Sequence, residues 1–374
     1  MNKLVDHSDT LSLLTLDHVD KSFKSAFNQT VKAVDDFSLS IQKGELLTLL
    51  GPSGCGKTTV LRILAGFESI DSGNIILSGE SITHIPAFSR NMPMIFQSYA
   101  LFPHLTIFEN IAYGLKIRKI KAQIIKNDVE MVLHVVNLAG LEQRYPRELS
   151  GGQQQRAALA RALVLKPEII LLDEPLSNLD MKLRTHTRAE IKRIQQTLGI
   201  TAIYVTHDQE EAISIADRIV IMDKGKIVQI GSPEDIYNTP STIFVADFIG
   251  NTNFIEAEIL KLTDDVAIVS VLDQQIAIQY PRDKTSFTHN EEVYLTIKPE
   301  AVRINQDHSV EAGFKGKISK ASFLGPNVEY EIEFGNSFIT ATQPNSNPRL
   351  TILPEGTEVN VELDENCLRL LKKD

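Results

Sequence analysis

The sequence predicts an α/β domain with a parallel sheet, followed by an all-β domain. Three continuous apolar runs, at 46–50, 169–172 and 202–205, are each followed by residues with helical spacing. Continuous apolarity is typical of strands that are covered on both faces, as in a parallel sheet. After Gly250 the pattern changes to short alternating runs separated by Asp, Asn, Pro and Gly. That pattern is typical of a small barrel or sandwich.

Length and composition limit the possible functions. A chain of 374 residues is longer than one typical domain, and we expect a first domain at 1–249 and a β-rich domain at 250–374. The net charge of −10 argues against nucleic acid as a partner, because backbone phosphates require a basic face. Two cysteines, Cys55 and Cys367, argue against a disulfide scaffold. No apolar run reaches the roughly 18–20 residues of a membrane-spanning helix, so a membrane role requires a partner.

A glycine-rich loop follows the first apolar run and precedes a helical pattern, which is the context that a phosphate-binding P-loop requires. The glycines let backbone N–H groups turn toward an anion, and the helix N-terminus adds partial positive charge. Lys57 can reach the outer phosphates of a nucleotide, and the Thr58 hydroxyl can complete the coordination of Mg²⁺. An inert turn is the alternative, and the full G-x-x-x-x-G-K-T pattern argues against it. The predicted nucleotide-binding residues of the loop are Gly51, Pro52, Ser53, Gly54, Cys55, Gly56, Lys57, Thr58 and Thr59.

Two carboxylates end the second apolar run. Ligands of parallel sheets bind at the carboxyl ends of the strands, so Asp173 is placed to hold Mg²⁺ through water. Glu174 is placed to take a proton from an attacking water. Two solvated turn acids are the alternative, which does not explain the apolar run directly before them.

A second helix start is also suited to an anion. Ser150 is a natural N-cap, and Gly151 and Gly152 leave the N–H groups of the first turn, which includes Gln153, unobstructed. A helix that is merely capped is the alternative. The presence of a P-loop in the same chain favours the functional interpretation.

Three further residues are candidates for contacts with the nucleotide, although none of them belongs to a local motif as complete as the P-loop. Phe23 can stack on an adenine ring, or it belongs to the core. Gln97 ends an apolar stretch and precedes an aromatic turn at 98–104, which either meets a partner protein or packs the neighbouring helices. His207 lies at the end of the third apolar run, where a γ-phosphate contact is possible, and the residues after it have the spacing of a capping box.

Together these residues resemble the ATP-binding subunits of ABC transporters, specifically of bacterial importers. Six family motifs occur in order across residues 13–240, namely Walker A (Gly51–Thr59), the Q-loop (Gln97), the signature motif (Leu149–Gln153), Walker B (Ile169–Glu174), the D-loop (Ser177–Asp180) and the switch histidine (His207). The resemblance implies an α/β P-loop NTPase fold with a RecA-like core and a helical subdomain at about 98–165. It also implies that the tail is an all-β, OB-like TOBE domain.

The same resemblance implies ATP and Mg²⁺ as ligands. Thr58, Gln97 and Asp173 are then the metal-binding residues. Glu174 is implied as the catalytic base, with His207 and Gln97 reporting the γ-phosphate. Phe23 occupies the family's adenine-stacking position, where Tyr is commoner.

The implied partners are a second copy of the subunit, two membrane permease subunits and, through them, a substrate-binding protein. The implied location is the cytoplasmic face of the cell membrane, as a peripheral protein. Segments 83–87, 96–104 and 244–250 most resemble spermidine/putrescine import subunits, with ferric-iron, organophosphate and sugar importers as alternatives. A soluble ABC protein without a permease is a further alternative, but the usual second cassette and long coiled-coil insertions are missing.

Overall fold

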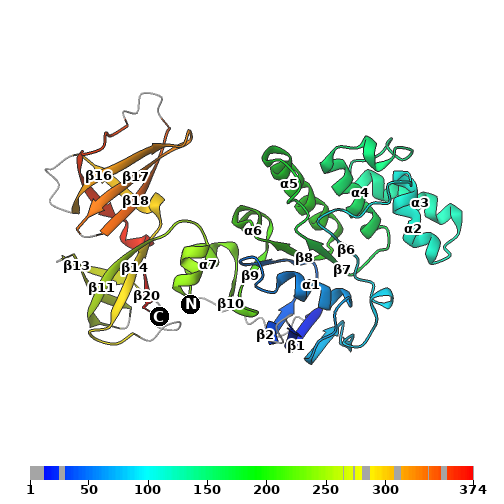
Figure 1. The fold of residues 1–374 in the computed structure, drawn as a ribbon, viewed down its shortest axis with the longest axis horizontal. Helices are drawn as coiled ribbons and strands as arrows, with labels where there is room; N and C mark the ends of the chain where they lie inside the picture. Colours follow the sequence, from blue (N-terminus) through cyan, green and yellow to red (C-terminus); the bar gives the residue numbers. More distant parts are fainter. Residues whose placement is uncertain are drawn as a thin grey trace, which may run out of the picture. The chain divides into compact units, whose positions relative to one another are not determined.

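A computed structural model describes residues 12–24, 30–263, 265–272, 274–279, 287–306, 313–335, 337–346 and 352–373. The chain divides into two compact units, residues 1–233 (the first unit) and residues 234–374 (the β-rich unit) (Figure 1). Residues 24–30 are polar, and the sequence predicts a surface loop there, but this segment lies mostly outside the described residues. None of the described helices combines the length and apolarity that crossing a membrane requires.

A six-stranded sheet forms the centre of the first unit. Its neighbouring strands are parallel, except for the two strands that come last in the sequence, which form an antiparallel hairpin at one edge. The three predicted buried strands are therefore confirmed, and so is the hairpin that the sequence predicts at 219–230. The strand that leads into the P-loop lies between two strands from much later in the chain. In spatial order the strands are β10 (Lys226–Gly231), β9 (Arg218–Asp223), β3 (Leu46–Leu50), β8 (Thr201–Thr206), β7 (Ile169–Asp173) and β6 (Met94–Ile95).

The continuous apolar runs are explained by burial on both faces of this sheet. Along β7, Ile169 and Leu171 belong to the core on the side of helix α1 (Lys57–Ala65), whereas Ile170 and Leu172 belong to the core on the other side, with α5 (Met181–Leu198). Figure 1 shows α1 and α5 on opposite sides of the sheet. Each fully buried Leu or Ile stabilises the fold by about 1.5–3 kcal/mol. A strand with alternating polar residues would supply apolar side chains to only one of the two cores.

Two further groups complete the first unit. An antiparallel sheet packs beside α1, with the strand order β2 (Thr30–Ile41), β1 (Leu14–Lys24), β4 (Ser72–Leu77) and β5 (Glu80–Ser81). The helical group comprises α2 (Ile107–Ile117), α3 (Ala122–Val135) and α4 (Gly151–Leu163). Helix α6 (Gln209–Ile215) follows β8.

Two five-stranded antiparallel sheets share one core in the β-rich unit, as the alternating sequence pattern predicts. Tyr330 is fully buried in that core. The first sheet contains β13 (Gln274–Gln279), β12 (Val266–Val271), β11 (Asn253–Leu262), β14 (Glu292–Ile297) and β20 (Arg369–Lys372). The second contains β15 (Val302–Asn305), β19 (Glu358–Leu363), β16 (Phe314–Phe323), β17 (Asn327–Phe334) and β18 (Ser337–Pro344).

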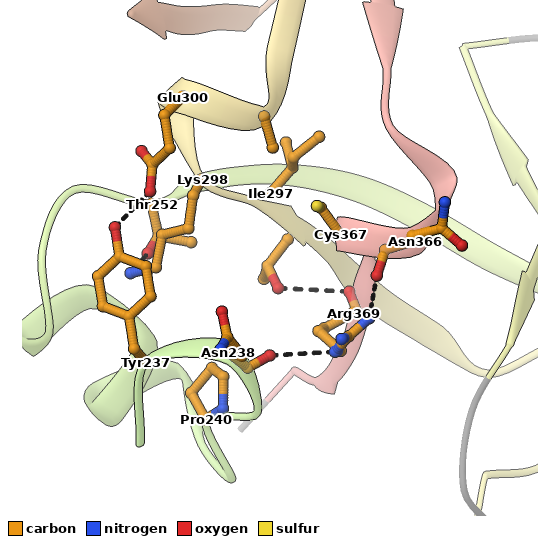
Figure 2. A pocket seen from close by; sticks show the side chains of 12 residues that line it. Tyr237, Asn238, Pro240, Thr252, Ile297, Lys298, Glu300, Asn366, Cys367 and Arg369 are labelled. Atoms are coloured by element: carbon orange, nitrogen blue, oxygen red, sulfur yellow. Dashed lines mark hydrogen bonds between the residues drawn. The ribbon is translucent and has the colours of Figure 1, made fainter. Parts of the chain in front are cut away.

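Helices α7 (Pro233–Asn238) and α8 (Ile243–Phe248) pack with the β-rich unit. The expected domain boundary at residue 249 lies beyond both of them. Figure 2 shows a pocket of about 250 Å³ where Tyr237 and Asn238 of α7 meet the strands. The Tyr237 hydroxyl donates to Glu300, and Arg369 Nε donates to the Asn238 carbonyl at 3.1 Å.

Lys298 binds the end of α8 in the same pocket. Its ammonium donates to the carbonyls of Ala246 (3.4 Å) and Ile249 and to the Thr252 hydroxyl (2.8 Å). The Tyr237 ring lies 4.7 Å from the ammonium. Burial lowers the pKa of Lys298 to about 8. Since cations stabilise the last carbonyls of a helix, these bonds explain why α8 stays with the strands.

Candidate functional site

Two glycines of the P-loop lie where no side chain fits. Gly56 has φ 110° and caps α1, and a Cβ there would lie 2.2 Å from the Ala33 carbonyl oxygen. A Cβ on Gly51 would lie 2.3 Å from the Met222 carbonyl oxygen. The loop therefore packs backbone against backbone, which leaves its inner side to an anion at the helix N-terminus.

Lys57 is held inside this loop. Its side chain is 5% exposed, and its Nζ donates to the carbonyl oxygens of Gly51 at 2.7 Å and Pro52 at 2.8 Å. Both acceptors are neutral, so neither cancels the ammonium charge. The positive charge remains available to a phosphate group, as expected of a P-loop lysine.

Two of the three predicted Mg²⁺ ligands lie together. The Thr58 hydroxyl donates to Asp173 Oδ1 at 3.1 Å, although 115 positions separate the two residues. Burial raises the pKa of the Asp173 carboxyl, and a cation beside it would favour its charged form. One hydroxyl and one carboxylate suit Mg²⁺, which takes few protein ligands and completes its shell with water and phosphate oxygens.

Gln97 is exposed and lies outside this pair. Among the described residues, its side chain forms no hydrogen bond with Thr58 or Asp173. Its backbone carbonyl accepts a hydrogen bond of 2.9 Å from the Asn178 amide in the turn after β7. The turn that carries Gln97 is thus tied to the segment that carries the two acids.

Glu174 and His207 form the second pair. Glu174 Oε1 lies 3.0 Å from His207 Nδ1, and both side chains are partly exposed. Glu174 has φ 44°, and its N–H donates to the Val205 carbonyl at 3.0 Å. A non-glycine residue in the left-handed region is strained, and such strain clusters at functional sites.

A polar network that the sequence did not reveal lies behind His207. Glu211 is 3% exposed, and its Oε2 accepts hydrogen bonds from the hydroxyls of Tyr204 (3.0 Å) and Thr206 (2.8 Å). Burial raises the pKa of the Glu211 carboxyl. Asp208 caps α6, because its Oδ1 accepts from the Glu211 N–H. The return bond of the predicted capping box is replaced, since the Asp208 N–H donates to Thr206 Oγ1.

Arg184 links this network to the turn before α5. It pairs with Asp208 at 3.2 Å and donates to the Leu179 carbonyl at 3.3 Å. The two turns that follow β7 and β8 are thereby fixed against each other. Arg184 lies one turn after Asp180, the N-cap of α5, and its place in the sequence alone does not distinguish it from the other arginines of that helix.

The N-terminus of α4, the second predicted anion-binding helix end, is capped by Ser150 as predicted. Ser150 caps α4 with its hydroxyl toward the Gln153 N–H (3.4 Å), and Gln153 Oε1 accepts from the Ser150 N–H (2.9 Å). Ser150 is exposed. Within the described part of this single chain, no hydrogen bond joins residues 150–153 to residues 51–59.

The aromatic candidates differ in exposure. Phe23 is 40% exposed, with the Lys21 ammonium 5.2 Å from its ring, so it is not a core residue. In the turn at 98–104, Tyr99 belongs to the core, and Phe102 is half-buried with its ring 4.7 Å from that of Tyr113. Internal packing is therefore confirmed for Tyr99, whereas Phe102 retains an accessible face.

Comparison with known proteins decides the family. The family model described as ABC transporter matches residues 34–177, and the TOBE domain model matches residues 295–371. The Fe(3+) ions import ATP-binding protein of Agrobacterium fabrum is 44% identical over 323 residues, which cover 85% of this chain and 89% of that protein. The chain belongs to the ABC importer ATP-binding subunits.

Other matches of this ABC importer subunit agree. The spermidine/putrescine import ATP-binding protein of Clostridioides difficile is 44% identical over 352 residues, or 92% of this chain and 95% of that protein. A dimeric ATP-binding cassette bound to ADP and Pi is 28% identical, with a TM-score of 0.52, and covers 59% of this chain and 98% of that chain. A Clostridium perfringens subunit of an ABC transporter complex is 25% identical, with a TM-score of 0.54, and covers 60% and 90%. The α/β P-loop fold and an ATPase activity coupled to transport follow from this membership.

Proposed function

We propose that this importer subunit hydrolyses ATP with Glu174 as the general base. The observation that carries the proposal is the contact of 3.0 Å between Glu174 and His207, at the sheet edge where Thr58 and Asp173 also meet. A carboxylate held by a neighbouring imidazole is oriented to accept a proton from water. His207 keeps that carboxylate in place, and the strained backbone at Glu174 directs it.

The P-loop residues bind and orient the nucleotide in this proposal. The N–H groups of residues 51–59 and the Lys57 ammonium hold the phosphates, and Phe23 stacks on the base. Thr58 and Asp173 would hold Mg²⁺, with Gln97 as a third ligand, and the metal supplies charge neutralisation between the phosphates. Gln97 reports the γ-phosphate to the turn at 98–104.

The complete site in this proposal requires two copies of the subunit. Ser150 is exposed at the start of α4, and within the described residues no hydrogen bond joins residues 150–153 to the P-loop of the same chain. In a head-to-tail pair with twofold symmetry, each such helix start meets the γ-phosphate held by the partner. The similarity to a dimeric cassette supports this arrangement. The pair would then drive two permease subunits at the cytoplasmic face of the membrane, supplied by a substrate-binding protein.

The proposed cargo is a small cationic solute. The relatives are named for Fe(3+) import and for spermidine/putrescine import, and both solutes are positively charged. The polyamine assignment remains a prediction, since Fe(3+) importers match equally well. Co-purification of the chain with its membrane partners, followed by ATPase assays with binding protein loaded with spermidine or with Fe(3+), decides between them. Stimulation by neither cargo would contradict both the polyamine and the Fe(3+) assignment.

The variant Glu174→Gln tests the catalytic assignment. The amide keeps the shape of the side chain but cannot accept the proton, and loss of a positioned general base typically lowers the rate by ~10² to 10⁴. ATP affinity should be retained, because one negative charge near the phosphates is removed. Glu210→Gln is the matched control, because Glu210 is an exposed acid on α6. Wild-type turnover in Glu174→Gln would remove Glu174 from this role.

A further inference from the structure

The turn that follows Gln97 contains two consecutive residues in a strained conformation. Tyr99 has φ 60° and Ala100 has φ 47°. Neither is glycine, and neither has the short polar side chain that makes the left-handed region accessible to Asn or Asp. Such a pair persists only where neighbouring groups hold it.

Arg161 supplies that hold from the last turn of α4. Its Nη1 donates to the Ala100 carbonyl at 2.7 Å, and its Nη2 donates to the Tyr99 carbonyl at 3.0 Å. The two nitrogens of one planar guanidinium thus bind the carbonyls of both strained residues, a geometry that the rigid fork of arginine favours. The same guanidinium lies 5.6 Å from the Phe102 ring.

Asn110 of α2 fixes the other half of the turn. It is fully buried, its Oδ1 accepts from the Phe102 N–H at 2.8 Å, and its Nδ2 donates to the carbonyls of Phe102 and Leu105, both at 3.1 Å. The turn is therefore bound at both ends by side chains of the helical group. Only the first half, next to Gln97, depends on Arg161.

We propose that Arg161 is a positioning residue that holds Tyr99 and Ala100 in the left-handed conformation and thereby fixes Gln97 relative to α4. Helix α4 has Ser150 at its other end, so one rigid element then connects Gln97 with the helix start that is proposed to meet the γ-phosphate of the partner. This role rests on the proposed function of Gln97 and Ser150.

Hydrogen–deuterium exchange of the full chain tests the hold directly. Arg161→Met keeps the aliphatic stem and removes the fork, and we expect the amides of residues 98–101 to exchange about tenfold faster, because their opening is no longer opposed. Arg156→Met, on the same helix, is the control and should leave them unchanged. Arg161→Lys, which cannot bind both carbonyls in one plane, replaces Arg161→Met if the latter does not fold. Unchanged exchange in a folded Arg161 variant would overturn the proposal.

A second substitution separates this role from a general packing role. Glycine adopts positive φ without strain, so Ala100→Gly should restore slow exchange and turnover to an Arg161→Met chain. A packing defect at Arg161 would not be repaired by removing a methyl group from another residue. Absence of any rescue therefore contradicts the positioning role.

The link to Gln97 has its own readout. Arg161→Met should lower kcat roughly tenfold with little change in KM, and the double variant with Gln97→Ala should be no slower than Gln97→Ala alone, since both act through one group. Independent, multiplying losses would show that Arg161 acts by another route and would overturn the link. If Gln97→Ala leaves turnover intact, the proposed function of Gln97 fails, and the exchange experiment still decides whether Arg161 holds the turn.

Discussion

At the scale of single residues, positive φ angles in the candidate site have different causes. Gly56 and Glu174 both have positive φ, but for opposite reasons. At Gly56 the backbone must approach another backbone, and glycine makes that possible. Glu174 is not glycine, so its positive φ strains the backbone. The strained conformation is retained because it turns the carboxylate toward His207. The sequence motif predicts that both residues matter, but not the contact between Glu174 and His207, which joins the ends of two strands.

The glycines of the P-loop provide a comparison at this scale. Gly56→Ala should destabilise the first unit strongly, because the new Cβ would lie 2.2 Å from a backbone carbonyl that cannot move aside. Gly54→Ala is the control, since it also has positive φ (83°) but no atom within 4 Å of its Cβ. The control should lose about 1–3 kcal/mol from strain alone. Thermal melting without nucleotide measures both, and equal losses would contradict the steric argument.

At the scale of elements, the sequence predicted the strands and helices better than their connections. Continuous apolar runs identify β3, β7 and β8, because each strand is covered on both faces. The same runs do not tell which strands are neighbours, and residues in contact can lie more than a hundred positions apart, as Thr58 and Asp173 do. The attachment of α7 and α8 was not predicted either. It depends largely on bonds from Lys298 and Arg369 to the carbonyls of Ile249 and Asn238, and backbone carbonyls have no sequence signature.

Lys298 makes the stability of the β-rich unit depend on pH. Its pKa of about 8 in the fold lies below the ordinary value of 10.5, so between these values the unfolded chain binds the additional proton and raising the pH favours the fold. We expect the unfolding free energy of this unit to rise by about 1–2 kcal/mol from pH 8 to pH 10. Lys298→Met should lack this rise.

Chemical denaturation at several pH values measures the effect. Lys261→Met is the matched control, because Lys261 is an exposed lysine on β11 of the same unit. Its pH profile should follow that of the unaltered chain. Parallel profiles for Lys298→Met and the unaltered chain would show that the Lys298 amine does not titrate in this range.

At the scale of the whole molecule, a dimer with shared ATP sites can be distinguished from a subunit whose site is complete by itself. Ser150→Arg and Lys57→Ala should each inactivate the subunit, because every composite site then carries a damaged half. A mixture of the two variants should regain part of the ATPase activity, since each mixed pair contains one undamaged site. A mixture that stays inactive, with a wild-type rate linear in protein concentration at high dilution, would contradict the shared site.

The central place of β3 also has a consequence for biosynthesis. Its neighbours β8 and β9 begin at residues 201 and 218, so both of its edges stay unpaired on the ribosome until those residues have emerged. An apolar strand with two open edges is a template for aggregation, and pairing over such a sequence distance is slow. We therefore expect the nascent chain to need protection by chaperones while residues 51–200 are synthesised, and a chain that stops before residue 201 to be degraded by proteases rather than to form a smaller ATPase.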